Sequence, residues 1–304
     1  MRMYLPEGEI INTEENLGYI DSVNGLLEAK RRGMILEARA ESCSPMHDLT
    51  VTLPACRAVI PREECAIGIK EGKTKDIAII SRVGKPVSFV VKDVVTENGE
   101  AVAILSRTEA QKACMEDYLL NLECGSIIDA TVTHIEQFGC FVDIGCGISS
   151  MIPIDAISVS RISHPSDRFS VGDKVNAILK SYDGEKFYLS HKELLGTWEQ
   201  NANRFNAGET VRGIVRSIEP YGIFIELAPN LAGLAEPREG VYAGQTASVY
   251  IKSINPEKMK IKLIIVDAYD YSPEKKCEYF INGGVLRHWR YSPDICDKII
   301  ETYF

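Results

Sequence analysis

The 304-residue sequence has no long apolar run, no closely spaced cysteine pair and no excess of positive charge. Without 18 consecutive apolar residues, a membrane-spanning helix is not expected. The opening residues MRMYLPEGEI lack the apolar stretch of a secretion signal. The nine cysteines are odd in number and form no C-x-x-C pair, which disfavours disulfides and zinc modules. These absences predict reduced thiols in a cytoplasmic protein without a bound metal.

The common catalytic motifs are also missing. The sequence contains no G-x-x-x-x-G-K-[ST] or G-x-G-x-x-G phosphate loop and no G-x-S-x-G nucleophile turn. Its five histidines are scattered and none has a metal-ligand spacing to a cysteine or carboxylate. Cys140 alternates with Val142 in a predicted strand, where an inert, half-buried thiol is expected. We therefore expect no catalytic residues, no cofactor and no small-molecule substrate.

The charge balance argues against a generally basic, nucleic-acid-coating surface. The formal net charge is −9. By segment, residues 1–119 and 120–205 are each −4, residues 206–270 are −1, and residues 271–304 are neutral. Because phosphate contacts supply most nucleic-acid affinity, any such binding must depend on a local face of the molecule.

An internal repeat organises the chain. Residues 125–145, GSIIDATVTHIEQFGCFVDIG, align without a gap with residues 208–228, GETVRGIVRSIEPYGIFIELA, and six of the 21 positions are identical. Each repeat continues through a second matching half, 171–190 and 242–264. Each repeat consists of short strands in which apolar and polar residues alternate, separated by turn residues. Within each repeat, no helical pattern lies between the strands. The pattern predicts two small antiparallel barrels.

A weaker copy precedes these repeats, and helical segments separate them. Residues 33–106 follow the same order of strands and end in Leu105-Ser106, as the second repeat ends in Leu189-Ser190. Helices are predicted at 13–31, 108–122 and 191–205. Near the C-terminus, Asn282-Gly283-Gly284 predicts a hairpin turn, and a short helix is expected at 293–303.

The resulting domain organisation has six parts. These are an N-terminal helical segment at 1–32, a diverged repeat at 33–107, a repeat at 123–192, a helical linker at 193–206, a repeat at 207–268, and a small C-terminal hairpin and helix element at 269–304.

The string G-x₆-V-x-x-I-x-x-[FY]-G-x-F-[VI]-[DE], with the later V-G-D-K-V and the closing L-S, resembles the S-one RNA-binding domain. This is the OB-fold repeat of bacterial small-subunit ribosomal protein one, and the chain looks like a short, few-repeat version. The resemblance implies an all-β chain of three tandem five-stranded OB barrels, the first degenerate, joined by short helices. It also implies binding of single-stranded RNA, a role in translation and a link to the small ribosomal subunit.

Repeated aromatic pairs beside a glycine are the candidate binding residues. A regular strand would point Phe138 and Phe141 to opposite faces, and we expect Gly139 to permit a bulge or twist that brings both to one surface. Tyr221 and Phe224 repeat this arrangement. Exposed aromatics stack on unpaired bases, and nearby cations hold phosphates. The candidate RNA-binding residues are Phe138, Phe141, Lys180, Lys186, Arg212, Arg216, Tyr221, Phe224, Lys252 and Lys260.

Two other interpretations remain open on the sequence alone. Phe141 and Phe224 are equally compatible with barrel cores, and exposed lysines are often merely solvated. The first repeat has no aromatic pair, so we expect it to pack or dock rather than bind RNA. A protein-docking scaffold, whose barrels bind a ribosomal or transcription partner, is therefore the alternative to RNA binding.

Overall fold

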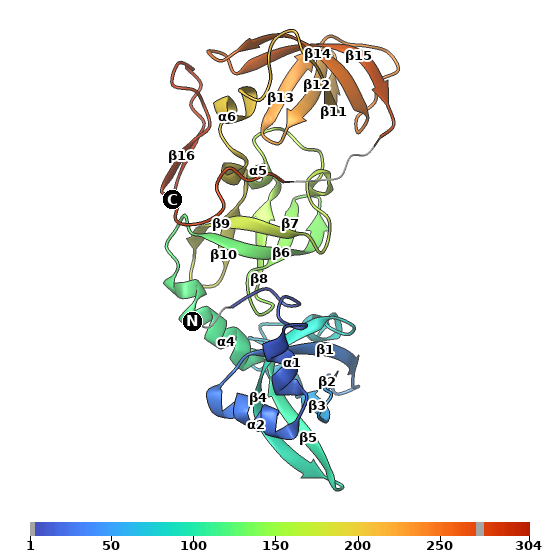
Figure 1. Cartoon of the computed structure of the whole chain (residues 1–304), viewed down its shortest axis with the longest axis vertical. Helices are drawn as coiled ribbons and strands as arrows, with labels where there is room; N and C mark the ends of the chain where they lie inside the picture. The colour runs from blue at the N-terminus through green and yellow to red at the C-terminus, as the bar shows by residue number, and fades with distance from the viewer. Residues whose placement is uncertain (1–3, 272–276) are drawn as a thin grey trace. The chain divides into compact units, whose positions relative to one another are not determined.

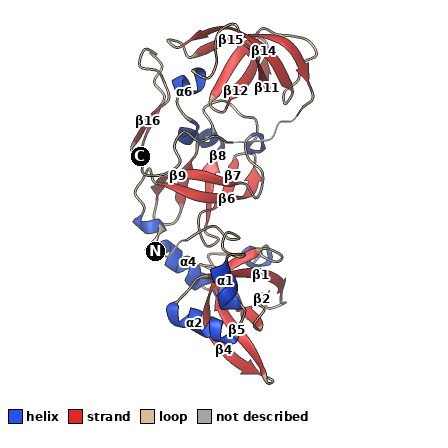
Figure 2. Cartoon of the chain, viewed as in Figure 1, coloured by secondary structure: helices blue, strands red, loops and turns tan. Residues whose placement is uncertain are grey.

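The computed structural model describes residues 4–271 and 277–304, and strands dominate it (Figures 1 and 2). Its residues group into two compact units. The first comprises Met1–Leu122 with Asp143–Ser149, and the second comprises Glu123–Val142 with Ser150–Phe304. Three sheets close into five-stranded barrels, which confirms the predicted fold class.

All three barrels have the same strand order. Around each barrel the first strand is followed by the second, third, fifth and fourth. The third and fifth strands run parallel, and the other pairs with a described register run antiparallel. The prediction of purely antiparallel barrels is therefore wrong for one strand pair in each barrel. The alternation of apolar residues shows that a strand is present but does not reveal the direction of its neighbour.

The first barrel lies in the first unit and has helices packed on it. Its strands are β1 Leu36–Cys43, β2 Leu49–Thr52, β3 Arg57–Ile60, β4 Pro86–Glu97 and β5 Glu100–Ser106. The helices are α1 Glu14–Ile20, α2 Val23–Arg32, α3 Ile77–Ile80 and α4 Arg107–Asp117, with single 3-10 turns η1 Arg62–Glu64 and η2 Leu119–Asn121. Leu26 and Ala29 of α2 join the barrel core.

The predicted helix at 13–31 is in fact two helices. Thr13 caps α1 by accepting a hydrogen bond from the Asn16 N–H, and Ser22 caps α2 by accepting one from the Gly25 N–H. An extended residue with a capping hydroxyl starts a new helix, which periodicity alone does not show. Gly33 ends α2 with a φ of 58°, in the left-handed region that glycine adopts without strain.

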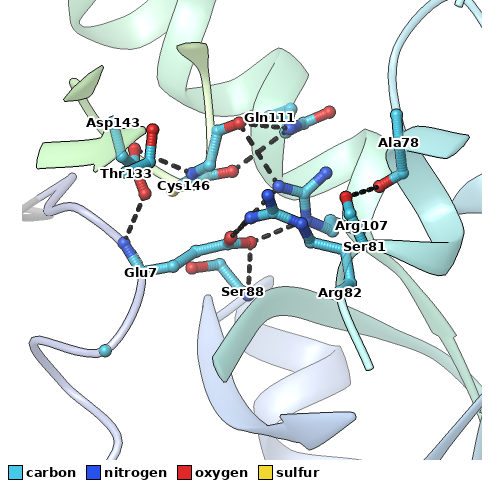
Figure 3. A network of polar contacts seen from close by, with 12 residues as sticks. Glu7, Ala78, Ser81, Arg82, Ser88, Arg107, Gln111, Thr133, Asp143 and Cys146 are labelled. Carbon is cyan, nitrogen blue, oxygen red and sulfur yellow. Dashed lines mark hydrogen bonds and ion pairs between the residues drawn. The ribbon is translucent and has the colours of Figure 1, made fainter. Parts of the chain in front are cut away.

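A buried polar network ties the first unit together (Figure 3). The Glu7 carboxylate accepts hydrogen bonds from the Arg107 guanidinium at 2.6 Å and from the Arg82 guanidinium at 3.2 Å. The Asp143 carboxylate accepts from the Glu7 N–H at 2.7 Å. Burial would raise the pKa of Glu7, but the two guanidinium groups hold it below its usual value. Burial and the neighbouring Glu7 charge raise the pKa of Asp143 to about 7.

The second unit contains two barrels. The second barrel has β6 Ile127–Glu136, β7 Gly139–Asp143, β8 Ser149–Pro153, β9 Lys174–Tyr182 and β10 Phe187–Ser190. The third has β11 Thr210–Glu219, β12 Gly222–Ala228, β13 Leu231–Ala235, β14 Thr246–Asn255 and β15 Lys260–Tyr269. Short helical segments accompany them: α5 Ile154–Ile157, η3 Pro165–Asp167, η4 Lys192–Leu195 and α6 Trp198–Ala202.

Buried polar contacts join the second and third barrels. Asn230, after β12, is fully buried, and its amide accepts from the Val159 N–H at 2.8 Å and donates to the Lys192 carbonyl at 2.7 Å. Arg168, between β8 and β9, pairs with Glu226 of β12. Both partners are nearly inaccessible to solvent. The segments flanking one barrel therefore supply partners to buried groups of the next.

The C-terminal prediction is partly wrong. Residues 293–303 contain no helix; instead β16 His288–Arg290 pairs antiparallel with β17 Glu301–Tyr303. The predicted turn at 282–284 does not join these strands. A strand forms at 288–290 because residues two apart in a strand point to the same side. Trp289 and Tyr291 have this spacing, and both are buried in the core of the third barrel. Residues 272–276 of the predicted element lie outside the described residues.

Candidate nucleic-acid interface

The aromatic pair of the second barrel is exposed and its rings are in contact distance. Phe138 lies in the two-residue turn between β6 and β7 and is 55% exposed. Phe141 of β7 is half-buried. Their ring centroids are 6.1 Å apart at an interplanar angle of 88°, an edge-to-face arrangement. One ring supports the other at the surface, so an unpaired base could stack on the exposed face.

The third barrel repeats this geometry. Tyr221 lies in the turn between β11 and β12 and is 67% exposed, while Phe224 of β12 is half-buried. Their ring centroids are 6.2 Å apart at an angle of 87°. The two pairs therefore match in exposure, distance and angle as well as in sequence.

The glycine after each exposed aromatic has a different purpose from the predicted bulge. A Cβ on Gly139 would lie 2.5 Å from the carbonyl oxygen of Ile152, and one on Gly222 would lie 2.7 Å from that of Ala235. Glycine is needed here because the neighbouring strand approaches closely. The aromatics share a surface because Phe138 and Tyr221 belong to turns. In the third barrel, a bulge of this strand pair lies in β11, between Val215 and Ser217, and not at Gly222.

The third barrel has a groove beside its aromatic pair. The groove has a volume of about 520 Å³, and Tyr221 and Lys252 line it. So do Lys262 of β15 and Arg238, which follows β13. Sequence reasoning missed these two cations. Lys262 is detectable only from cross-strand register, which places Phe224 beside Leu234 and Leu234 beside Lys262.

The same register reveals a third aromatic on the second barrel. In the parallel pair of β8 and β10, Tyr188 lies beside Met151, just as Lys262 lies beside Leu234. Tyr188 is 40% exposed, between the buried Phe187 and Leu189. Its hydroxyl donates to the Asp183 carboxylate at 2.8 Å. The second barrel therefore presents an additional ring where the third presents an ammonium group.

The predicted cations differ in availability. All but one of them are exposed to solvent: Lys180, Lys186, Arg212, Lys252 and Lys260. The Arg216 side chain is only 8% exposed and pairs with Glu226 and with Asp167. Arg216 also lies at the bulge of β11, so the even alternation that placed it on one face with Arg212 is broken. Its charge is satisfied inside the protein, which removes it from the candidate phosphate ligands.

Burial shifts the pKa of two groups of the second barrel, a histidine and a cysteine. Burial lowers the pKa of His191 to about 4 and raises that of the Cys140 thiol to about 12. Cys140 is fully buried rather than half-buried. Within residues 4–271 and 277–304, no three His, Cys, Asp or Glu side chains gather so that they could hold a metal ion. Nor does any helix of these ranges combine the length and apolarity of a membrane span.

Comparison with known proteins agrees with this geometry. Residues 121–192 match the family model of the S1 RNA binding domain. The small ribosomal subunit protein bS1 homolog of Bacillus subtilis is 33% identical over 124 residues, which cover 38% of this chain and 32% of that protein. The bS1 protein of Neisseria meningitidis is 28% identical over 186 residues, 58% of this chain and 28% of that protein.

One enzyme shares a shorter stretch. The 4-hydroxy-3-methylbut-2-enyl diphosphate reductase of Clostridium tetani is 29% identical over 118 residues, 39% of this chain but only 18% of the enzyme. The chain matches about a third or less of the length of each of these relatives. The family model, the ribosomal relatives and the barrel architecture agree that residues 121–192 of this chain form an S1 domain.

Proposed function

We propose that the chain binds single-stranded RNA, including messenger RNA, through its second and third barrels, and that it acts in translation. The domain boundaries proposed for these barrels are 123–192 and 207–268. The observation that carries the proposal is the duplicated edge-to-face aromatic pair on the two barrels, with ring distances of 6.1 and 6.2 Å. An exposed ring packed on a half-buried ring, at the same position of two barrels, forms a site in each barrel on which successive bases stack.

The proposed RNA contacts are of two kinds. Phe138 and Tyr221 stack on bases, supported by Phe141 and Phe224, with Tyr188 as a further ring. The exposed cations bind phosphates: Lys180, Lys186, Arg212, Lys252, Lys260, Lys262 and Arg238. Such contacts favour unpaired strands with little sequence preference, because every base has a π-face.

We further propose a non-catalytic role in the cytoplasm, with the small ribosomal subunit as a partner. The ribosomal relatives support this part of the proposal. The match to the reductase covers a small share of that enzyme, so it does not by itself assign this chain a reaction. No cofactor or small-molecule substrate is needed for binding by stacking and ion pairing.

The test is fluorescence anisotropy with a labelled 24-nucleotide poly-U strand and, separately, a labelled 24-base-pair RNA duplex. We expect binding of the single strand alone, with a logarithmic salt slope of about −0.7 for each phosphate contact. The Phe138→Ala/Tyr221→Ala variant removes two stacking contacts of about 1–3 kcal/mol each, so its affinity should fall at least tenfold.

Tyr242→Ala is the matched control, because Tyr242 is exposed in a loop and does not line the groove beside Tyr221. Its affinity for the poly-U strand should equal that of the wild type. Equal affinity of the double variant and the wild type would refute the stacking sites. Preference for the duplex would refute recognition of unpaired bases.

A further inference from the structure

The first barrel has a groove at the position of the RNA groove of the third barrel. In the first barrel, Thr50 pairs with Val59 and Val59 with Ile104. In the third, Phe224 pairs with Leu234 and Leu234 with Lys262. These rows cross the second, third and fifth strands of each barrel in the same order. Ile104 is therefore the counterpart of Lys262, and both line the groove of their own barrel.

Other positions correspond in the same way. A register shift falls on Lys92 in β4 and on Lys252 in β14, so these two lysines are counterparts. Val59 and Leu234 are counterparts in the rows above. Glu63 lies four residues after Val59, and Arg238 lies four residues after Leu234, so Glu63 is the counterpart of Arg238. The groove of the first barrel thus replaces one cation by an anion and another by an apolar side chain.

The cations that remain in this groove are already neutralised. The Lys92 ammonium pairs with Glu64 at 3.0 Å and with Glu109 at 3.1 Å. The Arg62 guanidinium pairs with Asp76 at 2.7 Å. By contrast, among the described residues no ion pair engages two carboxylates that line the groove, those of Asp48 and Glu63. A phosphate backbone would therefore meet uncompensated negative charge.

Apart from the carboxylate of Asp93, which pairs with Lys30, the remaining surface of the groove is apolar. Met46, Val95 and Ile104 line it, and Met46 is 74% exposed. The groove has a volume of about 820 Å³, larger than its counterpart on the third barrel. The Asp48 carboxylate accepts a hydrogen bond from the Arg62 N–H at 2.8 Å, but this neutral donor leaves its charge uncancelled. An apolar wall beside carboxylates without an ion-pair partner complements a chain that carries both apolar and cationic side chains.

We infer that this groove binds an extended segment of a partner protein in which lysine or arginine residues are interspersed with apolar ones. The ammonium or guanidinium groups pair with Asp48 and Glu63, and the apolar side chains pack against Met46, Val95 and Ile104. Binding here does not require RNA on the other barrels. The chain then has two classes of site, one for nucleic acid and one for a basic polypeptide.

The test uses the full chain and a fluorescein-labelled dodecapeptide of alternating lysine and valine. We expect saturable binding by anisotropy and no displacement by unlabelled poly-U. The Glu63→Arg/Ile104→Lys variant gives the first groove the side-chain types of the third barrel. It should bind the peptide at least tenfold more weakly, while its binding of poly-U is retained or strengthened, which also shows that the variant folds.

A charge-matched control separates the groove from the general acidity of the protein. Glu71→Arg/Ile77→Lys makes the same two substitutions at exposed positions of the first unit that do not line the groove. Its peptide affinity should stay within twofold of the wild type. Equal weakening by both variants, no saturable binding, or displacement of the peptide by poly-U would each overturn the inference. The RNA proposal is judged separately by the Phe138→Ala/Tyr221→Ala variant.

Discussion

Single side chains carry the candidate interface, and their exposure decides which of them are available. The recurrence of an aromatic residue before glycine identified Phe138 and Tyr221, the two most exposed rings of the proposed site. The cation prediction was less successful, because Arg216 is paired internally with Glu226 and Asp167. Partners that are distant in the chain do not appear in a local pattern. For the same reason Tyr188 and Lys262 became visible only through cross-strand register.

His191 makes the stability of the second unit depend on pH. It is fully buried, and burial lowers the pKa of its imidazole to about 4, against about 6.5 for an exposed histidine. The folded state binds this proton less readily than the unfolded state. The associated stability is complete above pH 6.5 and is lost as the pH falls towards 4. Between pH 7.5 and pH 5 the loss is about 2 kcal/mol.

Urea unfolding of the wild type and of His191→Gln at these two pH values tests this prediction. The variant has no imidazole to protonate at this position. Between pH 7.5 and pH 5, its free energy of unfolding should therefore fall by about 2 kcal/mol less than that of the wild type. His134→Gln, at an exposed position, should keep the wild-type pH dependence. An identical pH dependence for His191→Gln and the wild type would contradict the prediction.

At the level of helices and strands, the repeat predicted the barrels and their five strands each. The predictions failed where tertiary contacts override local pattern. Residues 293–303 have no helix because β16 and β17 pair, with Trp289 of β16 buried in the third barrel core. The closing parallel pair of each barrel was also missed, since strand direction depends on the path of the whole repeat.

The buried charges between the second and third barrels provide a test at this scale. Glu226 accepts from both Arg168 and Arg216, and the side chains of all three are less than a tenth exposed. Glu226→Gln leaves two buried guanidinium groups without this anion. Loss of one partner from a buried ion pair costs about 3–5 kcal/mol, so we expect destabilisation of about 3 kcal/mol in urea unfolding.

Glu257→Gln is the control for Glu226→Gln, because Glu257 is exposed in the turn between β14 and β15. Its effect on the free energy of unfolding should stay within about 0.5 kcal/mol. A loss below 1 kcal/mol for Glu226→Gln would show that the buried pairs contribute little to stability.

For the whole molecule, the grouping of the second and third barrels in one compact unit has a consequence for RNA length. Once an RNA strand is long enough to reach both barrels, its second contact is intramolecular. Its affinity then rises by more than the larger number of possible binding positions along a longer strand would give. We expect a rise of at least tenfold at some point in a series of labelled poly-U strands of 6, 12, 18 and 24 nucleotides.

The Phe138→Ala variant should lose most of this rise, because only the third barrel then offers its aromatic pair. Tyr242→Ala should retain it. A wild-type affinity that increases only in proportion to the number of binding registers would mean that the two barrels act independently.

The C-terminal hairpin affects the order in which the chain can complete its fold during synthesis. The strands of the third barrel end at Tyr269, yet its core also contains Trp289 and Tyr291. During translation the first barrel has all its strands once Ser106 has left the ribosome. The third barrel must wait about twenty residues beyond its last strand before those two rings emerge. The nascent chain therefore finishes the first barrel early, whereas the third barrel's core stays incomplete until the segment that carries Trp289 and Tyr291 has emerged.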